Sequence, residues 1–406
     1  MRFLPSLPII LIACVFLLLP MAHLRPVALW PIYAAEIPLL LVASLVLIRK
    51  SMYEELWTLL QGERWLLVGS FGLISGIGLA FLHNELPFHS LGLVKSFVIL
   101  PLLLTWLVLL VVKSADEARV IVKFWWFGLV MSALVSLLFF LDGKLTYDGR
   151  LAAWYSSPNE LAMLLAPGVL LGLWLAQAHG PKQRLWYFLG TLSIALALCL
   201  TRSYTVLAST TITSLWLLIP VITRLTQRQK LVSLMLGAVL GMSVLMLEGG
   251  TDKFQSLFTF DERSSFASRL MIWEAASKIS QDTFPWGIGI GRFQAAYLDY
   301  QIYFPPYLEW AVPEPHNLVL SLFLAAGLLG LLSFAWVVSM TLRRLWLLST
   351  LENNEASALA RLYLSLFVLL LLIGLVDTPY FKNDLTLVWW GLVGLAATLL
   401  YRVRRD

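Results

Sequence analysis

The sequence predicts an all-α, polytopic membrane protein with about twelve transmembrane helices and one large outer loop between the ninth and tenth helices. Of its 406 residues, 59% are hydrophobic and only 13% are charged, whereas a soluble domain carries about 25% charged residues. The mean hydropathy is +0.81, and the apolar residues form long unbroken runs instead of the short alternating segments of an outer-membrane barrel. A soluble enzyme and a membrane β-barrel are therefore excluded.

Apolar runs of about 18 to 25 residues mark the expected spans. The first run has no small-residue cleavage site and leads directly into a second run, so we expect a retained helix and not a secretory signal. Three regions follow: spans one to nine in 1–248, a loop in 249–315, and spans ten to twelve in 316–406. The expected spans are 4–22, 28–48, 64–82, 90–112, 118–141, 159–178, 184–201, 204–223, 230–248, 316–341, 359–376 and 384–402.

The distribution of basic residues predicts the orientation in the membrane. Most of the 29 Lys and Arg residues lie at span ends on one side, among them Arg49, Lys50 and Arg64. Short cytoplasmic loops carry the excess of Lys and Arg, so we expect both termini in the cytoplasm and the 249–315 loop outside. The basic residues form no cluster on a soluble face, so no nucleic-acid partner is expected.

The 249–315 loop is the only segment outside the spans that is long enough to form structure of its own. A helix is expected to begin at Ser265 and to run to about Asp282. We expect this helix to lie on the bilayer surface with its apolar face down. The apolar residues that recur at helical spacing are Phe266, Leu270, Trp273 and Ala276.

Neither a metal site nor a cofactor is expected. Both cysteines, Cys14 and Cys199, lie in predicted spans far from the outer loop, so no disulfide or cysteine metal site is predicted. The run of Gly287, Gly289 and Gly291 follows no strand and precedes no Lys-Ser or Lys-Thr pair. It favours a tight turn over a phosphate-binding loop.

His316 is the first candidate for chemistry. Histidine is the most common general base near neutral pH. Pro313 and Pro315 stop any helix before it, so His316 is expected at the outer end of the tenth span. A simple helix-capping role is the alternative, and the sequence leaves both open.

Arg150, Arg202 and Arg269 are candidates for binding an anion. They lie outside the membrane or at its outer edge in the predicted topology, and a planar, permanently charged guanidinium suits phosphate. Pairing with lipid headgroups is the alternative for each of them. Arg202 stands out because a very short turn holds it near the hydrocarbon boundary, where an unpaired charge is costly.

His316 and Asn317, followed by nine residues, Gly327, two residues and Gly330, form a pattern on the helix after the long loop. This pattern resembles the signature of the O-antigen ligases and the related O-antigen polymerases, which are glycan transferases of the bacterial inner membrane. Three further segments are similar to parts of that family, in the same order, and the similarity covers about residues 145–390. They are Arg150 with Ser157-Pro158-Asn159, Arg269 with Trp273 and the Pro285-x-Gly287-x-Gly289-x-Gly291-x-Phe293 run, and Val376-Asp377-Thr378-Pro379-Tyr380.

The resemblance implies an inverting, metal-independent glycosyltransferase that works on the periplasmic face of the inner membrane. Its donor would be a glycan on undecaprenyl diphosphate. For a ligase the acceptor is lipid A-core, and for a polymerase it is a second lipid-linked glycan. The spacing after His316 favours the ligase. The implied roles are His316 as the base, Arg150, Arg202 and Arg269 at the donor diphosphate, and Asn159, Trp273, Asn317 and Asp377 in support.

One position departs from the family pattern. Family members often have Ser-Arg where this chain has Ser203-Tyr204, with Arg202 in front of the pair. Either Arg202 supplies the guanidinium from a shifted position, or this protein binds its donor differently.

A transporter or lipid flippase is the alternative from another functional class, because twelve spans with both termini inside is a common transporter layout. Transporters built from two halves tend to have their long loop in the cytoplasm between spans six and seven. Here that connection is short and the long loop lies outside, which favours the enzyme.

Overall fold

The computed structural model describes residues 5–26, 32–49, 51–84, 88–224, 226–228, 265–303, 312–351 and 355–403. These residues form helices and connecting turns, so the predicted all-α class is confirmed, and they contain eight helices that are long and apolar enough to cross a membrane. The predicted ninth span, 230–248, lies outside the described residues, so the total of about twelve stays a prediction. The eight are α4 (Arg64–Leu82), α5 to α6 (Ser90–Val111), α7 (Ala115–Leu141), α8 (Pro158–Gln177), α9 (Pro181–Leu200), α10 (Tyr204–Ile222), α15 (Leu318–Ser349) and α16 (Glu355–Gly374).

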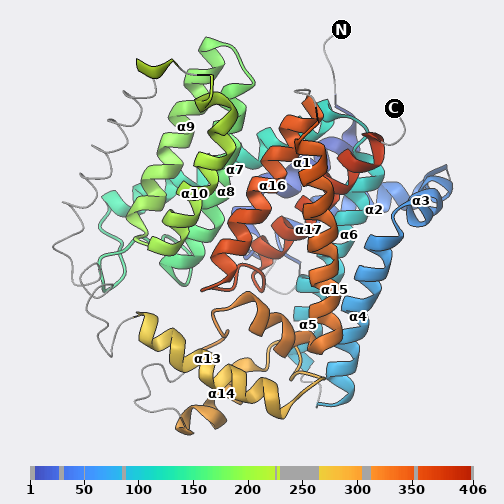
Figure 1. The fold of residues 1–406 in the computed structure, drawn as a ribbon, viewed down its shortest axis with the longest axis vertical. Coiled ribbons are helices and arrows are strands. Elements are labelled where there is room, and N and C mark those ends of the chain that lie inside the picture. Colours follow the sequence, from blue (N-terminus) through green and yellow to red (C-terminus); the bar gives the residue numbers. More distant parts are fainter. Residues whose placement is uncertain are drawn as a thin grey trace.

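Most of the remaining helices are shorter than these eight, and α17, with 21 residues, packs against α6 and α15 within the bundle. Figure 1 shows α3 projecting sideways from the bundle, and α13 with α14 across its lower end. These helices are α1 (Leu7–Leu17), η1 (Leu19–Met21), α2 (Glu36–Ile48), α3 (Ser51–Gly62), α13 (Ser265–Asp282), α14 (Phe293–Tyr300), η3 (Gln301–Tyr303) and α17 (Asn383–Val403); α5 begins at Phe88, and a π-helical turn, Lys95–Ile99, joins it to α6.

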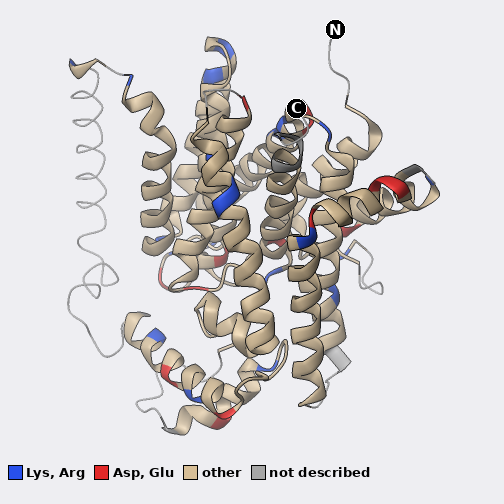
Figure 2. Ribbon diagram, turned by 45° about the vertical axis from the view of Figure 1, so that its right-hand side comes forward, with Lys and Arg blue, Asp and Glu red and all other residues tan. Residues whose placement is uncertain are grey.

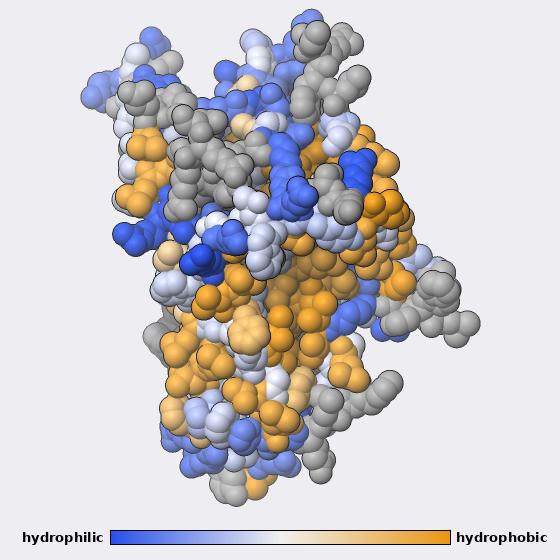
Figure 3. Space-filling model, turned by 90° about the vertical axis from the view of Figure 1, so that its right-hand side faces the viewer, coloured by the Kyte–Doolittle hydropathy of each residue, from blue (hydrophilic) through white to orange (hydrophobic). Residues whose placement is uncertain are grey.

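The surface supports a multi-pass membrane protein. Figure 2 shows much of the charge toward the two ends of the helix bundle. Figure 3 shows an apolar band between two hydrophilic ends. Such a band suits the hydrocarbon core of a bilayer, where helices satisfy their own backbone hydrogen bonds.

Helices α4 and α15 approach each other closely because α4 carries small residues where they meet. Gly69, Gly72 and Gly76 are spaced three and four residues apart and therefore share one face of α4. A Cβ atom on Gly76 would lie 2.5 Å from the backbone nitrogen of Gly330 on α15. Small residues allow this kind of backbone contact between membrane helices.

We expect Gly76→Ala to destabilise the protein by about 1–3 kcal/mol, because the added methyl group overlaps the α15 backbone. The measurement is the thermal unfolding midpoint of the purified protein in detergent. Gly78→Ala in the same helix is the matched control, because its Cβ atom would meet nothing within 4 Å. Equal midpoints for the two variants would contradict the close packing of α4 on α15.

The α13 helix has the predicted bounds, and its predicted contact with the bilayer surface stays a prediction. Ala276 is buried, whereas Phe266 and Leu270 are 46% and 42% exposed. The buried face packs on α14 and α15. This face consists of Met271, Ile272, Ala275, Ala276 and Ile279.

The turn between α16 and α17 is held rigidly by two buried tryptophans. Trp389 Nε1 donates to the carbonyl oxygen of Pro379 at 2.6 Å, and Trp390 Nε1 donates to the hydroxyl oxygen of Tyr380 at 2.8 Å. Both indoles are buried, so these hydrogen bonds are shielded from water. The turn therefore holds Asp377 and Lys382, which lie within it, in fixed positions.

Candidate active site

The glycine run after α13 forms a turn that packs against α15. Gly287, Gly289 and Gly291 all have positive φ, which confirms the predicted turn. The amide of Ile288 donates to the Leu324 carbonyl oxygen at 2.7 Å, and the amide of Gly289 donates to the same oxygen at 3.0 Å. These two amides are used to dock the turn against α15 and do not cradle an anion.

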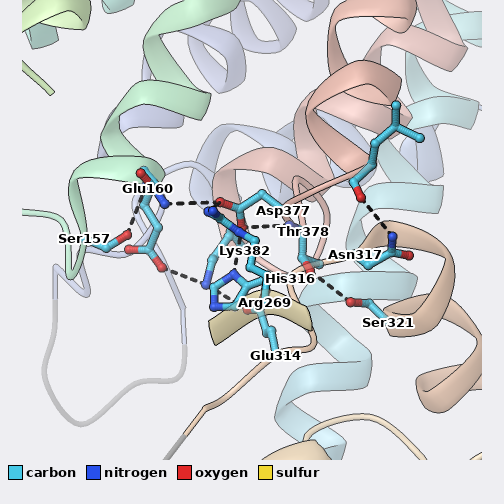
Figure 4. A network of polar contacts seen from close by, with 12 residues as sticks. Ser157, Glu160, Arg269, Glu314, His316, Asn317, Ser321, Asp377, Thr378 and Lys382 are labelled. Atoms are coloured by element: carbon cyan, nitrogen blue, oxygen red, sulfur yellow. Dashed lines mark hydrogen bonds and ion pairs between the residues drawn. The ribbon is translucent and has the colours of Figure 1, made fainter. Parts of the chain in front are cut away.

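A cavity of about 510 Å³ lies where the starts of α8 and α15, the α16–α17 turn and α13 meet. Such a volume lies within the range of about 300–1,000 Å³ that is usual for small-molecule sites. Figure 4 shows the polar side chains that converge there. The cavity is lined by Ser156, Ser157, Asn159, Glu160, Met163, Ser268, Arg269, Ile272, Val312, Pro313, Glu314, His316, Asp377 and Lys382.

His316 and Asp377 form a hydrogen-bonded pair in this cavity. Nδ1 of His316 lies 3.0 Å from Oδ1 of Asp377, which also accepts a hydrogen bond from the amide of Thr378 at 2.9 Å. A carboxylate can only accept, so Nδ1 carries the proton and donates it to Asp377. Nε2 of the neutral ring is then left to accept a proton, as in the catalytic triads of hydrolases.

Asp377 is nearly fully buried, yet it is held in its ionised form. Burial works to raise the pKa of Asp377. The hydrogen bond from His316, the charge of Arg269 and the Thr378 amide outweigh burial, so the pKa lies below its usual value. Asp377 is therefore a carboxylate at neutral pH and fixes the tautomer of His316.

Arg269, on α13, brings a positive charge to the same carboxylate. Its Nη2 lies 3.8 Å from Oδ2 of Asp377. Its Nε is buried and has no hydrogen-bond partner among the described residues. A buried donor without a partner is costly, and a bound anion would satisfy it.

Arg150 is linked to the His316–Asp377 pair through hydrogen bonds of Asn159. Nη2 of Arg150 donates to Oδ1 of Asn159 at 2.7 Å, and Nδ2 of Asn159 donates to Oδ2 of Asp377 at 3.4 Å. Burial and the charge of Arg269 both lower the pKa of Arg150. Two guanidinium groups that repel each other mark a position where a phosphate would be attracted.

Trp273 and Asn317 position the backbone around His316. Nε1 of Trp273 donates to the carbonyl oxygen of His316 at 3.2 Å, and His316 has a left-handed φ of 49°. Oδ1 of Asn317 caps α15 by accepting from the amides of Val319 and Leu320, and its Nδ2 donates to the Leu375 carbonyl oxygen at 3.0 Å. Asn317 is therefore the N-cap of α15. His316 does not cap the helix, and its ring is hydrogen-bonded to Asp377.

Arg202 is not among the described residues that line the cavity. It lies in the turn between α9 and α10, with a φ of 48°, and its Nη1 is 3.8 Å from the position that a Cβ atom would take on Gly149. The same turn is tied to Arg150, whose Nε donates to the Thr201 carbonyl oxygen at 2.8 Å. Arg202 is thus next to the loop that carries Arg150 and outside the cavity lining.

The structure also places three charged residues in the cavity that the sequence did not single out. Nζ of Lys382 lies 2.7 Å from Oε1 of Glu160 and 2.7 Å from Oε1 of Glu314. Burial works to lower the pKa of Lys382, but the two carboxylates outweigh it and raise the pKa. The available signals were weak: Glu314 stands between two prolines just before His316, and Lys382 follows Asp377 closely.

A protein-family model described as O-antigen ligase matches residues 188–335. This stretch includes Arg269 and His316, whereas Arg150, Asn159 and Asp377 lie outside it. A search of curated proteins found no match. The family resemblance seen in the sequence is confirmed, and the domain indicates a function of ligase or polymerase type in glycan processing.

Proposed function

We propose that this chain, which carries an O-antigen ligase domain at residues 188–335, is an inverting glycosyltransferase. It moves a glycan from undecaprenyl diphosphate to lipid A-core on the periplasmic face of the bacterial inner membrane, with both termini in the cytoplasm. The observation that carries the proposal is the His316–Asp377 pair, with its 3.0 Å hydrogen bond, beside Arg269 in one cavity. A base and an anion-binding group in one cavity are what this transfer requires.

The reaction is a single displacement at the anomeric carbon. Nε2 of His316 takes the proton of the attacking acceptor hydroxyl, whose oxygen forms the new bond to the anomeric carbon. The bond from that carbon to the diphosphate oxygen breaks, and the electron pair leaves with the diphosphate. Asp377 stabilises the imidazolium that forms. Attack opposite to the leaving group inverts the configuration.

The arginines supply the positive charge at the leaving group. Arg269 uses its unpartnered Nε, Arg150 acts from behind Asn159, and Arg202 acts from the neighbouring turn. Charges that are fixed before the reaction stabilise the developing negative charge most effectively. The transfer therefore needs no metal ion and is expected to proceed in the presence of EDTA.

We expect Arg269→Ala to lower the rate of transfer by about 10²- to 10³-fold, the usual effect of removing one donor to a developing negative charge. The measurement is single-turnover transfer from purified lipid-linked donor. Lys278→Ala on the same helix is the control, because Lys278 is exposed and forms an ion pair with Asp282 one turn away. An unchanged rate in Arg269→Ala would remove Arg269 from the diphosphate site.

The function itself is tested with purified enzyme and lipid-linked repeat unit, first alone and then with lipid A-core. A ligase forms product only when lipid A-core is present. A ladder of longer lipid-linked glycans without lipid A-core would contradict the ligase and support the polymerase. Uptake or lipid flipping by the reconstituted protein, without any glycan product, would support a transporter instead.

A further inference from the structure

A second cavity of about 370 Å³ adjoins the reaction cavity. Ser156, Glu160 and Lys382 line both cavities. The second cavity is unlike the first, because rings make up much of its wall. The other residues of its lining are His23, Phe97, Trp154, Tyr155, Phe381, Asn383, Asp384 and Leu385.

We propose that this second cavity binds a sugar ring of the acceptor glycan and aligns its hydroxyl with His316. The proposal rests on the proposed function, because it assigns the place of the acceptor in that reaction. A pyranose ring has an apolar face of C–H groups and an edge of hydroxyl groups. The cavity offers a partner for each.

The aromatic wall is preorganised. The rings of Trp154 and Tyr155 have centroids 5.8 Å apart, and the ring of His23 lies 5.3 Å from that of Tyr155. Nε1 of Trp154 donates to the carbonyl oxygen of Pro20 at 3.3 Å, and the hydroxyl oxygen of Tyr155 lies 3.3 Å from the same oxygen. Aromatic faces fixed in this way offer contact area at little entropic cost on binding.

The polar groups of the cavity suit hydroxyl groups. Asp384 is buried, and its Oδ2 accepts from the Tyr155 hydroxyl at 2.9 Å while Oδ1 accepts from the Leu385 amide at 2.8 Å. A carboxylate has about four acceptor positions, so some are left for a ligand. Nδ1 of His23 is buried and has no hydrogen-bond partner in the described part of the chain, and a sugar hydroxyl would satisfy it.

The same groups disfavour the donor diphosphate. No arginine is among the described residues of the lining, and the carboxylates of Glu160 and Asp384 repel phosphate. Lys382 is already held between Glu160 and Glu314 at 2.7 Å from each. Glu314 is two residues from His316, so the shared wall leads from the second cavity to the proposed base.

The test is Trp154→Ala in steady-state transfer assays. We expect the KM for acceptor to rise about fivefold, because one aromatic contact is worth about 1 kcal/mol. The kcat and the KM for lipid-linked donor should stay unchanged. Trp186→Ala is the control, because Trp186 is an exposed tryptophan on α9. A rise in the donor KM alone would overturn the proposal and assign the cavity to the donor glycan.

Two further measurements keep the test decisive. If Trp154→Ala does not fold, Tyr155→Phe removes only one hydroxyl group, and a raised acceptor KM is again expected. Binding of lipid-free core oligosaccharide, measured calorimetrically in a His316→Ala background, does not depend on turnover. Binding that survives Trp154→Ala and Tyr155→Phe would overturn the acceptor site. Oligosaccharide binding without transfer in the unaltered protein would instead contradict the proposed function.

Discussion

His316→Ala is expected to lower the rate of glycan transfer by about 10²- to 10⁴-fold, the usual contribution of a positioned general base. The ring nitrogen that faces away from Asp377 is lost, so the acceptor hydroxyl must attack with its proton in place. Donor binding should remain, because Arg269 and Arg150 are unchanged. Single-turnover transfer and equilibrium binding of the donor, measured on the same preparation, separate the two effects.

Two further variants serve as controls. His316 has a left-handed φ of 49°, which asparagine tolerates better than alanine; His316→Asn should therefore fold well and still be inactive. His179→Ala removes a histidine at the end of α8 whose Nδ1 lies 2.8 Å from the Leu175 carbonyl oxygen, and it should retain full activity. Retained turnover in both His316 variants would exclude His316 from the mechanism.

The fold could be predicted from the sequence wherever a long apolar run has clear ends. The predicted bounds of 64–82 are those of α4, and the predicted bounds of α13 also hold. The α3 helix was missed because it has only 12 residues and mixes apolar residues with Glu54 and Glu55. The length of α15 was also underestimated, because its last turns carry Arg343 and Arg344 past the apolar run.

The candidate site could be predicted in part. Arg150, Asn159, Arg269, His316 and Asp377 lie in segments that resemble a known family, and the structure links them through hydrogen bonds and ion pairs. Each motif is local, so the sequence alone could show it.

The cluster of Lys382 with Glu160 and Glu314 could not be predicted in this way. Its members come from three segments far apart in the chain, and only folding brings the carboxylate oxygens of Glu160 and Glu314 to 2.7 Å from Nζ of Lys382. A lone charged residue in an outer loop carries no signal of its partners. The face of α13 that packs on α15 could not be predicted for the same reason, since its packing partner is distant in sequence.

Asp377→Asn is expected to lower kcat by up to about 10⁴-fold, the effect of the corresponding change in a catalytic triad. The amide of asparagine can donate a hydrogen bond to Nδ1 of His316, which moves the ring proton to Nε2. His316 is then in the wrong tautomer and cannot accept the proton of the acceptor hydroxyl. The KM for donor should change little. Asp282→Asn is the control, because Asp282 is an exposed residue at the end of α13 that pairs with Lys278 and Tyr300.

The pH dependence of stability distinguishes this role from a purely structural one. The pKa of Asp377 in the folded protein lies below its ordinary value of 3.8. Its ionised form therefore stabilises the fold above pH 3.8, and this contribution is lost as the pH falls through the lower folded pKa. Asp377→Asn should remove this contribution, so the variant should be less stable than the unaltered protein at neutral pH and should not lose that stability as the pH falls through the pKa of Asp377. A fall in kcat in the neutral range, in variant protein that is still folded at the assay temperature, would assign the defect to the His316 tautomer. Full activity of the variant would show that His316 does not need Asp377.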